Sequence, residues 1–325
     1  MASKKALALI SGGLDSLLAA KIILDQGVLV EGINFFSGFF GEGSTFRNAR
    51  KQKKIVSQAF GSQWIADQLK IPLHVIDVVE AFKPVLFQPR YGYGSQLNPC
   101  LDCKIFMIQQ ALAWVKSQQF DFLITGEVLG QRPMSQRKDT LPLIEKKTGS
   151  DDLLLRPLSA KLLAPTLPER MGWVDREQLW DISGRGRKKQ IALAEKLGFK
   201  EIPQPAGGCL LTESCYSHRL RDLWKAREKM DYDLDDIQRL KAGRHIRPRP
   251  NFKIIIGRDE IDNQFLDRYK QSLIYLTCAN TEGPLALIEG EWREGDQKLA
   301  ASILARYTRQ GKAGKTVSIT VSFPD

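Results

Sequence analysis

The chain has 325 residues, of which 43% are hydrophobic and 26% charged. That is enough apolar material for globular domains with cores of their own, so neither disulfides nor a structural metal is needed for folding. No stretch approaches the roughly 20 apolar residues of a membrane helix, and the apolar run near the N-terminus is too short for a secretory signal. Five cysteines, an odd number, do not suggest a disulfide framework. We therefore expect a cytoplasmic protein with reduced thiols and no membrane partner.

The formal net charge is +11. Such an excess favours a polyanionic partner, because each phosphate that a cation neutralises releases counterions. Charge alone is weak evidence, and it gains weight only where the cations cluster near suitable chemistry.

The first part of the chain alternates between short apolar runs and helical patterns. Apolar runs at residues 6–10 and 28–35 flank a helical pattern at 16–24, which predicts a βαβ unit. More elements of this kind are expected: strands at 73–79 and 121–125, and helices at 47–69 and 103–116. The alternation predicts a doubly wound α/β domain with a parallel sheet.

The pattern changes after residue 130. Residues 131–167 are rich in proline, charge and turn formers, which indicates long loops around a site, and 176–197 has a helical pattern. The remaining elements are expected to be helices at 217–230 and 298–309 and strands at 253–256, 272–277, 285–288 and 316–323. We place a domain boundary near Tyr216, giving an α/β domain over 1–216 and a small α+β module over 217–325.

A glycine-rich turn follows the first strand directly, with the sequence Ser11-Gly12-Gly13-Leu14-Asp15-Ser16. Such a turn directs backbone N–H groups and a helix N-terminus toward an anion, and the serine hydroxyls add donors. Asp15 would repel a phosphate unless a cation lay between them, and Mg²⁺ would satisfy both. The alternative is a βα turn that needs glycine for its shape alone. The six-residue pattern at this position favours a nucleotide.

This turn resembles the signature of the PP-loop ATP pyrophosphatases, which have a HUP-like fold and split ATP into AMP and pyrophosphate to activate a carbonyl oxygen. No Gly-Lys-Ser/Thr follows, so it is not a Walker A loop. The resemblance implies that Ser11, Gly12, Gly13, Asp15 and Ser16 hold the departing pyrophosphate.

Three cysteines occur in two motifs. Asn98-Pro99-Cys100-Leu101-Asp102-Cys103 places two thiols at a loop-to-helix junction, where a helix N-terminus is expected to lower the thiol pKa, and Cys209 follows Gly207-Gly208. Three thiolates can hold three irons of a 4Fe–4S cluster and leave the fourth iron open to an exogenous ligand. A zinc site, a redox pair and a catalytic persulfide are the alternatives, and the persulfide is the strongest rival. Cys215 and Cys278 are expected to be buried as small apolar residues.

The three motifs in this order resemble the tRNA thiouridine synthetases, a branch of the PP-loop enzymes, over the chain to about Tyr216. Their second nucleotide and substrate loop resembles residues 125–131, so Thr125, Gly126 and Gln131 join the expected ATP site. We expect this protein to lack the N-terminal RNA-binding region of the 4-thiouridine enzymes and a rhodanese-like C-terminal extension, both found in better-known branches. This departure weakens the persulfide mechanism and favours a cluster that binds sulfide.

The expected RNA contacts lie in three places. Residues 244–253 are dense in arginine, and Arg258 follows one strand later. The C-terminal module that contains them resembles the small RNA-binding domain at the end of NFACT-type proteins. A basic cluster at 184–189 and Lys161 in the central loops are further candidates, and a solvated charged surface is the alternative for each. The candidate residues are Lys161, Arg185, Arg187, Lys188, Arg244, Arg247, Arg249, Lys253 and Arg258.

These observations predict ATP-dependent tRNA thiolation. A uridine carbonyl oxygen would attack the α-phosphate of ATP, and sulfur would then replace the AMP group. Asp15 is assigned to Mg²⁺, and Cys100, Cys103 and Cys209 are assigned to the cluster. The expected product is 4-thiouridine, with 2-thiouridine in the anticodon as the second choice. A small-molecule PP-loop ligase and a non-enzymatic RNA-binding protein are the other classes. Inorganic sulfide or a cysteine desulfurase would supply the sulfur, and a homodimer is a further hypothesis.

Overall fold

The computed structural model describes residues 3–40, 61–150, 152–203, 208–279 and 282–324. The chain divides into two compact units, Met1–Ser214 and Cys215–Asp325. Each unit is built on one five-stranded sheet. Within the described residues, no helix combines the length and the apolar character needed to cross a membrane.

The sheet of the first unit is parallel throughout, in the strand order β3-β2-β1-β4-β5. Its strands are β1 (Lys5–Leu9), β2 (Leu29–Phe36), β3 (Leu73–Asp77), β4 (Phe122–Thr125) and β5 (Leu154–Leu155). The central strands are apolar on both faces, as a sheet covered on both sides requires: Ala6, Leu7 and Ala8 of β1 are all buried. The predicted doubly wound α/β fold is confirmed.

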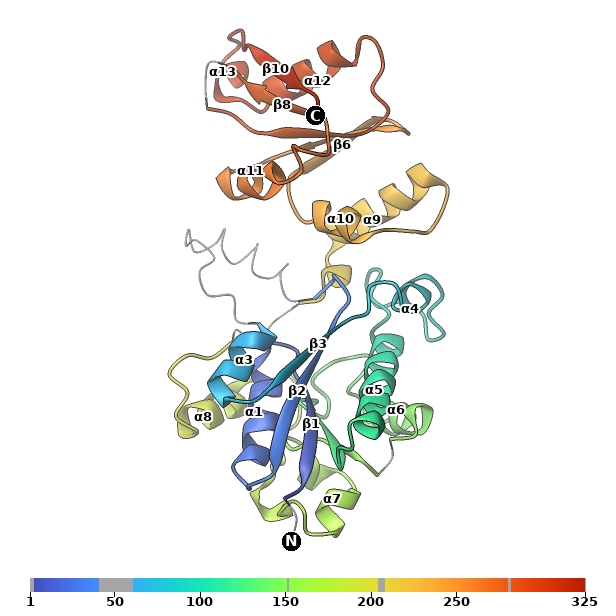
Figure 1. The fold of residues 1–325 in the computed structure, drawn as a ribbon, viewed down its shortest axis with the longest axis vertical. Helices are drawn as coiled ribbons and strands as arrows, with labels where there is room; N and C mark the ends of the chain where they lie inside the picture. Colours follow the sequence, from blue (N-terminus) through green and yellow to red (C-terminus); the bar gives the residue numbers. More distant parts are fainter. Residues whose placement is uncertain (1–2, 41–60, 151, 204–207, 280–281, 325) are drawn as a thin grey trace. The chain divides into compact units, whose positions relative to one another are not determined.

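Helices cover both faces of this sheet (Figure 1). One face packs on α1 (Leu14–Leu24), α3 (Ser62–Leu69) and α8 (Lys188–Lys196), and the other on α5 (Cys100–Ser117) and α6 (Thr140–Thr148). Shorter elements complete the unit: α4 (Lys83–Phe87), α7 (Leu167–Arg170), η1 (Ala160–Leu162), η2 (Arg176–Gln178) and η3 (Leu210–Thr212).

Two predictions for this unit were wrong in part. The central loops contain α6 and β5, whose buried residues the proline and charge content concealed. The helix expected over 176–197 is a 3₁₀ turn followed by an irregular segment, and only α8 is α-helical. Gly184 has φ +83° and donates its N–H to the Leu129 carbonyl at 2.7 Å, so the backbone leaves helical geometry there. The predicted helix 47–69 is described only from residue 61 onward.

The sheet of the second unit is antiparallel, in the order β10-β8-β9-β7-β6. Its strands are β6 (Arg244–Arg249), β7 (Phe252–Ile256), β8 (Tyr275–Cys278), β9 (Ala286–Gly290) and β10 (Ile319–Ser322). Its helices are α9 (Ser214–Arg227), α10 (Leu234–Arg239), α11 (Glu260–Asp267), α12 (Asp296–Ala305) and α13 (Arg309–Lys312). Phe252, Ile254 and Ile256 of β7 pack with Leu304 of α12 in its core. The predicted small α+β module is confirmed.

Candidate nucleotide and cysteine site

The strand order of the parallel sheet reverses between β1 and β4. In doubly wound folds, ligands bind outside the carboxyl ends of the strands at such a reversal. The glycine-rich turn follows β1, β4 ends at Thr125, and Gly126 follows it directly. The first nucleotide motif and the second, which lie far apart in the sequence, therefore meet at this edge.

The glycine-rich turn is held by hydrogen bonds of its own. Gly12 has φ +81°, and a Cβ there would lie 3.2 Å from the Gly61 backbone, so a side chain would be strained and crowded. The Ser16 hydroxyl donates to the Gly13 carbonyl at 2.8 Å and accepts from the Ser11 N–H at 3.3 Å. α1 begins at Leu14 without a side-chain cap, so its first N–H groups are available to an anion.

Gly126 fits against the start of α1. A Cβ at this position would lie 2.5 Å from both the Asp15 carbonyl carbon and the Ser16 backbone nitrogen. Glycine is thus required by the close approach of two backbone segments, the loop after β4 and the turn after β1. The sequence motif predicted Gly126 in the ATP site, and this contact explains why the residue at this position is glycine.

Asp15 is the centre of a polar network. Its Oδ2 accepts hydrogen bonds from Gln131 Nε2 and Arg187 Nη1, each at 2.7 Å, and Gln190 Nε2 donates to Gln131 Oε1 at 2.9 Å. Its Oδ1 is buried and has no hydrogen-bond donor among the described residues. A buried carboxylate oxygen without a donor is a position that a cation would satisfy, so Asp15 fits a Mg²⁺ ligand.

Two members of this network were not predicted in these positions. Arg187 was assigned to RNA, but it forms an ion pair with Asp15 at 2.7 Å. Gln190 was not assigned, although it lies one turn before Leu193 and Ala194 on the buried face of α8. A polar residue within an apolar helical stripe was the signal that would have identified it.

A second buried network lies beside the first. Glu127 is 1% exposed, and its Oε2 accepts from Thr125 Oγ1 at 3.1 Å and from Arg156 Nε at 3.0 Å. Burial opposes ionisation of Glu127, but Lys104 and Arg156 outweigh it and hold the pKa of this carboxyl below its usual value. Arg156 also pairs with Glu145. Lys104 follows Cys103 in α5, and its Nζ lies 3.9 Å from Glu127 Oε1.

The three motif cysteines are brought together at this same edge. Cys100 and Cys103 lie in the first turn of α5. The segment that carries Cys209 is held by backbone hydrogen bonds from Leu210 to Phe39 at 3.0 Å and from Leu97 to Leu211 at 3.2 Å. Burial is the main reason that the pKa of Cys209 is raised, and the neighbouring thiols of Cys103 and Cys100 raise it further, as groups of like charge do.

Burial dominates the acidity of these thiols. It raises the pKa of Cys103 to about 12 and also raises that of Cys209. The expectation that the helix N-terminus would lower the thiol pKa was therefore wrong for Cys103, because desolvation of the thiolate is the larger effect. Cys215 is exposed, so the prediction that it is buried was also wrong, and Cys278 is half-buried.

The placement of the three motif cysteines bears on whether they could hold an iron–sulfur cluster. Among the described residues, no three His, Cys, Asp or Glu side chains gather closely enough to hold one metal ion. Ligands of a four-iron cluster bind different irons and so lie farther apart than ligands of a single ion. Three half-buried thiols that are not in a disulfide have the donor chemistry of such a site.

The predicted RNA contacts of the first unit lie in different surroundings. Lys161 donates to the Glu177 carbonyl at 2.8 Å and lines a surface pocket with Ile22 and Asp25, at the far end of α1 from the glycine-rich turn. Arg185 and Lys188 are exposed on either side of Arg187, next to the Asp15 network. Of these three residues, only Arg185 and Lys188 lie next to the proposed nucleotide site.

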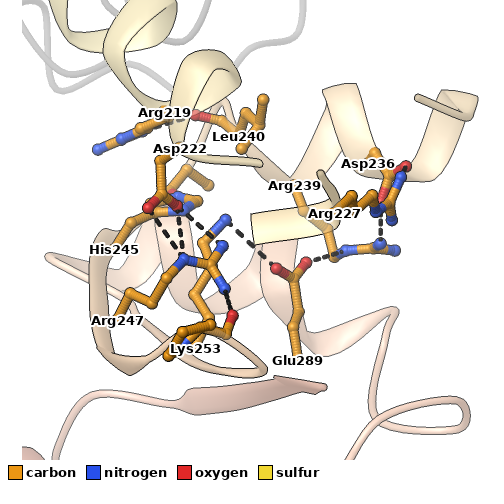
Figure 2. A network of polar contacts seen from close by, with 12 residues as sticks. Arg219, Asp222, Arg227, Asp236, Arg239, Leu240, His245, Arg247, Lys253 and Glu289 are labelled. Atoms are coloured by element: carbon orange, nitrogen blue, oxygen red, sulfur yellow. Dashed lines mark hydrogen bonds and ion pairs between the residues drawn. The ribbon is translucent and has the colours of Figure 1, made fainter. Parts of the chain in front are cut away.

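Most of the predicted RNA contacts in the second unit are engaged by acidic side chains, and Figure 2 shows this for Arg247 and Lys253. Arg247 donates to Asp222 through Nε at 2.9 Å and through Nη2 at 2.8 Å. Lys253 is 1% exposed and pairs with Glu289 at 3.3 Å, and Glu289 also accepts from Arg239 at 2.6 Å. Burial lowers the pKa of Lys253.

Arg249 and Arg258 are also paired with acidic side chains. Arg249 forms a two-point ion pair with Asp296, at 2.5 and 2.6 Å, and Arg258 Nε donates to Asp262 at 2.7 Å. Arg244 differs, because its guanidinium lies 4.9 Å from the centre of the Tyr307 ring.

Two parts of the chain match families of known proteins. A family model described as thiamine biosynthesis protein (ThiI) matches residues 1–161, and one described as NFACT protein RNA binding domain matches residues 243–325. The chain thus resembles the ThiI family over residues 1–161 and the NFACT RNA-binding domain over residues 243–325, which confirms the expected resemblances. The ThiI match contains the PP-loop, Cys100 and Cys103, while Cys209 and α8 lie beyond it.

Individual relatives are distant. The tRNA-specific 2-thiouridylase MnmA 1 of Syntrophus aciditrophicus (strain SB) is 24% identical over 226 residues, covering 67% of this chain and 56% of that protein. The tRNA-specific 2-thiouridylase MnmA of Sulfurimonas denitrificans is 31% identical over 131 residues, covering 39% and 35%. A crystal structure of a 4-thiouridine synthetase–RNA complex with bound ATP superimposes with a TM-score of 0.42 at 21% identity, covering 64% of this chain and 45% of that one. The chain spans only about half or less of the length of these proteins.

Proposed function

We propose that this chain is an ATP-dependent tRNA thiouridine synthetase. The observation that carries the proposal is a continuous path of contacts from the cysteine helix to the PP-loop. Lys104 of α5, next to Cys103, reaches Glu127, while Gly126 beside it packs directly on Asp15. Sulfur chemistry and ATP chemistry would therefore share one edge of the sheet.

The first step is activation of the uridine. ATP would bind with its phosphates on the PP-loop, where Ser11, Gly13 and the start of α1 supply donors. Mg²⁺ on Asp15 Oδ1 would offset the charge of the departing pyrophosphate. A uridine carbonyl oxygen attacks the α-phosphate and the bond to the β-phosphate oxygen breaks, which gives an adenylated base and pyrophosphate.

The second step replaces oxygen with sulfur. A sulfide nucleophile attacks the activated carbon, and the C–O bond breaks with AMP as the leaving group. Cys100, Cys103 and Cys209 would hold a 4Fe–4S cluster, which when bound supplies an iron position open to exogenous sulfide. Arg185 and Lys188, exposed beside Arg187, are proposed to contact the RNA backbone near the reacting base.

We propose 4-thiouridine as the product, with inorganic sulfide or a cysteine desulfurase as the sulfur source. The likeness to proteins named 2-thiouridylases makes 2-thiouridine the second candidate. In the persulfide variant of the mechanism, one of the three cysteines would carry the sulfur itself.

Mass spectrometry of tRNA nucleosides from a gene-deletion strain tests the proposal. We expect loss of one thiouridine, its restoration by the wild-type gene and by Cys215→Ala, and no restoration by Cys103→Ala. Loss of 4-thiouridine supports the lead product, and loss of 2-thiouridine moves the target to the other carbonyl. Persistence of every thionucleoside, in a strain without a second such enzyme, would refute tRNA thiolation.

A further inference from the structure

Four cations occur at every third position near the C-terminal end of the chain. They are Arg306, Arg309, Lys312 and Lys315, which we call the basic segment, and all four side chains are exposed. No Asp or Glu occurs between Asp296 and Asp325. Within the part of the chain that the structure describes, none of the four forms an ion pair with a carboxylate.

The backbone of the basic segment is held in a defined shape. Thr308 caps α13 by accepting from the Gly311 N–H at 2.9 Å, and it is 1% exposed. A Cβ at Gly311 would lie 2.0 Å from the Ala305 carbonyl oxygen, so the chain passes close to the end of α12. Residues three apart in helical backbone lie on the same side, as Arg309 and Lys312 do in α13. The cations are thus displayed on a fixed scaffold.

An aromatic ring and a further cation adjoin this scaffold. Tyr307 lies between Arg306 and Arg309 of the basic segment and is half-buried. The centre of its ring is 4.9 Å from the Arg244 guanidinium of β6. Arginine planes and aromatic rings are the surfaces on which unpaired RNA bases stack. The basic segment therefore combines phosphate-binding charge with a stacking surface.

Binding a phosphate at the predicted arginine-rich strand, β6, would cost more electrostatic energy than binding one at the basic segment. A phosphate at Arg247 or Arg249 would compete with Asp222 or Asp296, each already hydrogen-bonded to the guanidinium. A phosphate at the basic segment would displace only water and counterions, and the release of counterions favours binding.

We propose that the basic segment, with Arg244 and Tyr307, is the surface through which this unit binds the tRNA backbone. The β6 and β7 cations other than Arg244 then serve to hold α9, α10 and α12 on the sheet. This inference rests on the proposed function, since it requires tRNA to be the ligand.

The test compares two full-length variants with equal loss of charge. The first carries Arg306→Gln, Arg309→Gln, Lys312→Gln and Lys315→Gln. The matched control carries four substitutions at exposed cations elsewhere in the same unit: Arg221→Gln, Lys225→Gln, Lys229→Gln and Arg293→Gln. The Kd for unmodified tRNA is measured over a range of salt concentrations, and thermal unfolding confirms that both variants are folded.

The first variant should bind tRNA at least about tenfold more weakly than the wild type, with the slope of log K against log salt reduced by about three. The control should stay within about threefold of the wild type. Equal weakening of both variants, or tight binding by the first, would overturn the assignment of the surface while leaving thiolation intact. Failure of the wild-type chain to bind tRNA would instead overturn the proposed function.

Discussion

Gly126 lies so close to Asp15 that a Cβ at position 126 would be 2.6 Å from the Asp15 carbonyl oxygen. The loop after β4 and the turn after β1 are thereby held together at the backbone level. The proposed nucleotide site depends on this approach, because it sets Asp15 beside the second motif.

Gly126→Ala should therefore impair ATP use. The added methyl group must push β4 and the PP-loop apart, at a cost of about 1–3 kcal/mol in stability. ATP–pyrophosphate exchange should fall steeply. Gly186→Ala is the control, because a Cβ there meets nothing within 4 Å. Unchanged exchange in the Gly126 variant would show that the contact does not position the turn.

The Glu127–Arg156 ion pair should be costly to break from one side. Arg156→Met leaves the buried Glu127 carboxylate without its main donor, and such changes destabilise by about 3–5 kcal/mol. The double variant with Glu127→Gln should recover much of the loss. Arg170→Met, which removes the exposed ion pair with Asp152, should cost less than about 1 kcal/mol. Urea unfolding measures all three, and equal losses for Arg156→Met and Arg170→Met would contradict the role of burial.

The cysteines should differ in their reaction with iodoacetamide. Only the thiolate reacts, and burial raises the pKa of Cys103 to about 12. In metal-free folded protein at about pH 8, Cys215 should be alkylated at least about tenfold faster than Cys103 or Cys209, since Cys215 is exposed. Peptide mapping by mass spectrometry gives the rates. Equal rates in the folded chain, matching those in denaturant, would contradict the raised pKa values of Cys103 and Cys209.

His245 should make the second unit sensitive to acid. Burial, with help from Lys253 and Arg219, holds its pKa well below 6.5 in the folded state. As pH falls below about 6.5, the unfolded chain takes up a proton that the folded chain does not, so stability falls by about 1.4 kcal/mol per pH unit from this group.

Thermal unfolding of His245→Gln and His218→Gln at several pH values measures this effect. His245→Gln should lose less stability than the wild type between neutral pH and about pH 5. His218 is exposed, so His218→Gln should retain the wild-type pH dependence. Identical pH profiles for both variants would contradict the assignment.

The Ser11–Ser16 turn, the two cysteine motifs and the alternation of strands and helices were readable from the sequence, because each depends on local geometry or on a fixed spacing of residues. They predicted the doubly wound domain, the candidate ATP and thiol residues, and the small C-terminal module. The local pattern was also misleading in one place: prolines and charges over 131–167 predicted long loops and concealed α6 and β5.

Only the tertiary structure decided which charges are available. Arg187 and Arg247 look alike in the sequence as members of basic clusters, yet each is paired with a carboxylate far along the chain, Asp15 and Asp222 respectively. Likewise, a helix N-terminus predicts acidic thiols, but burial around Cys103 raises its pKa. Charge pairing and desolvation depend on which segments pack together, and no local pattern encodes that.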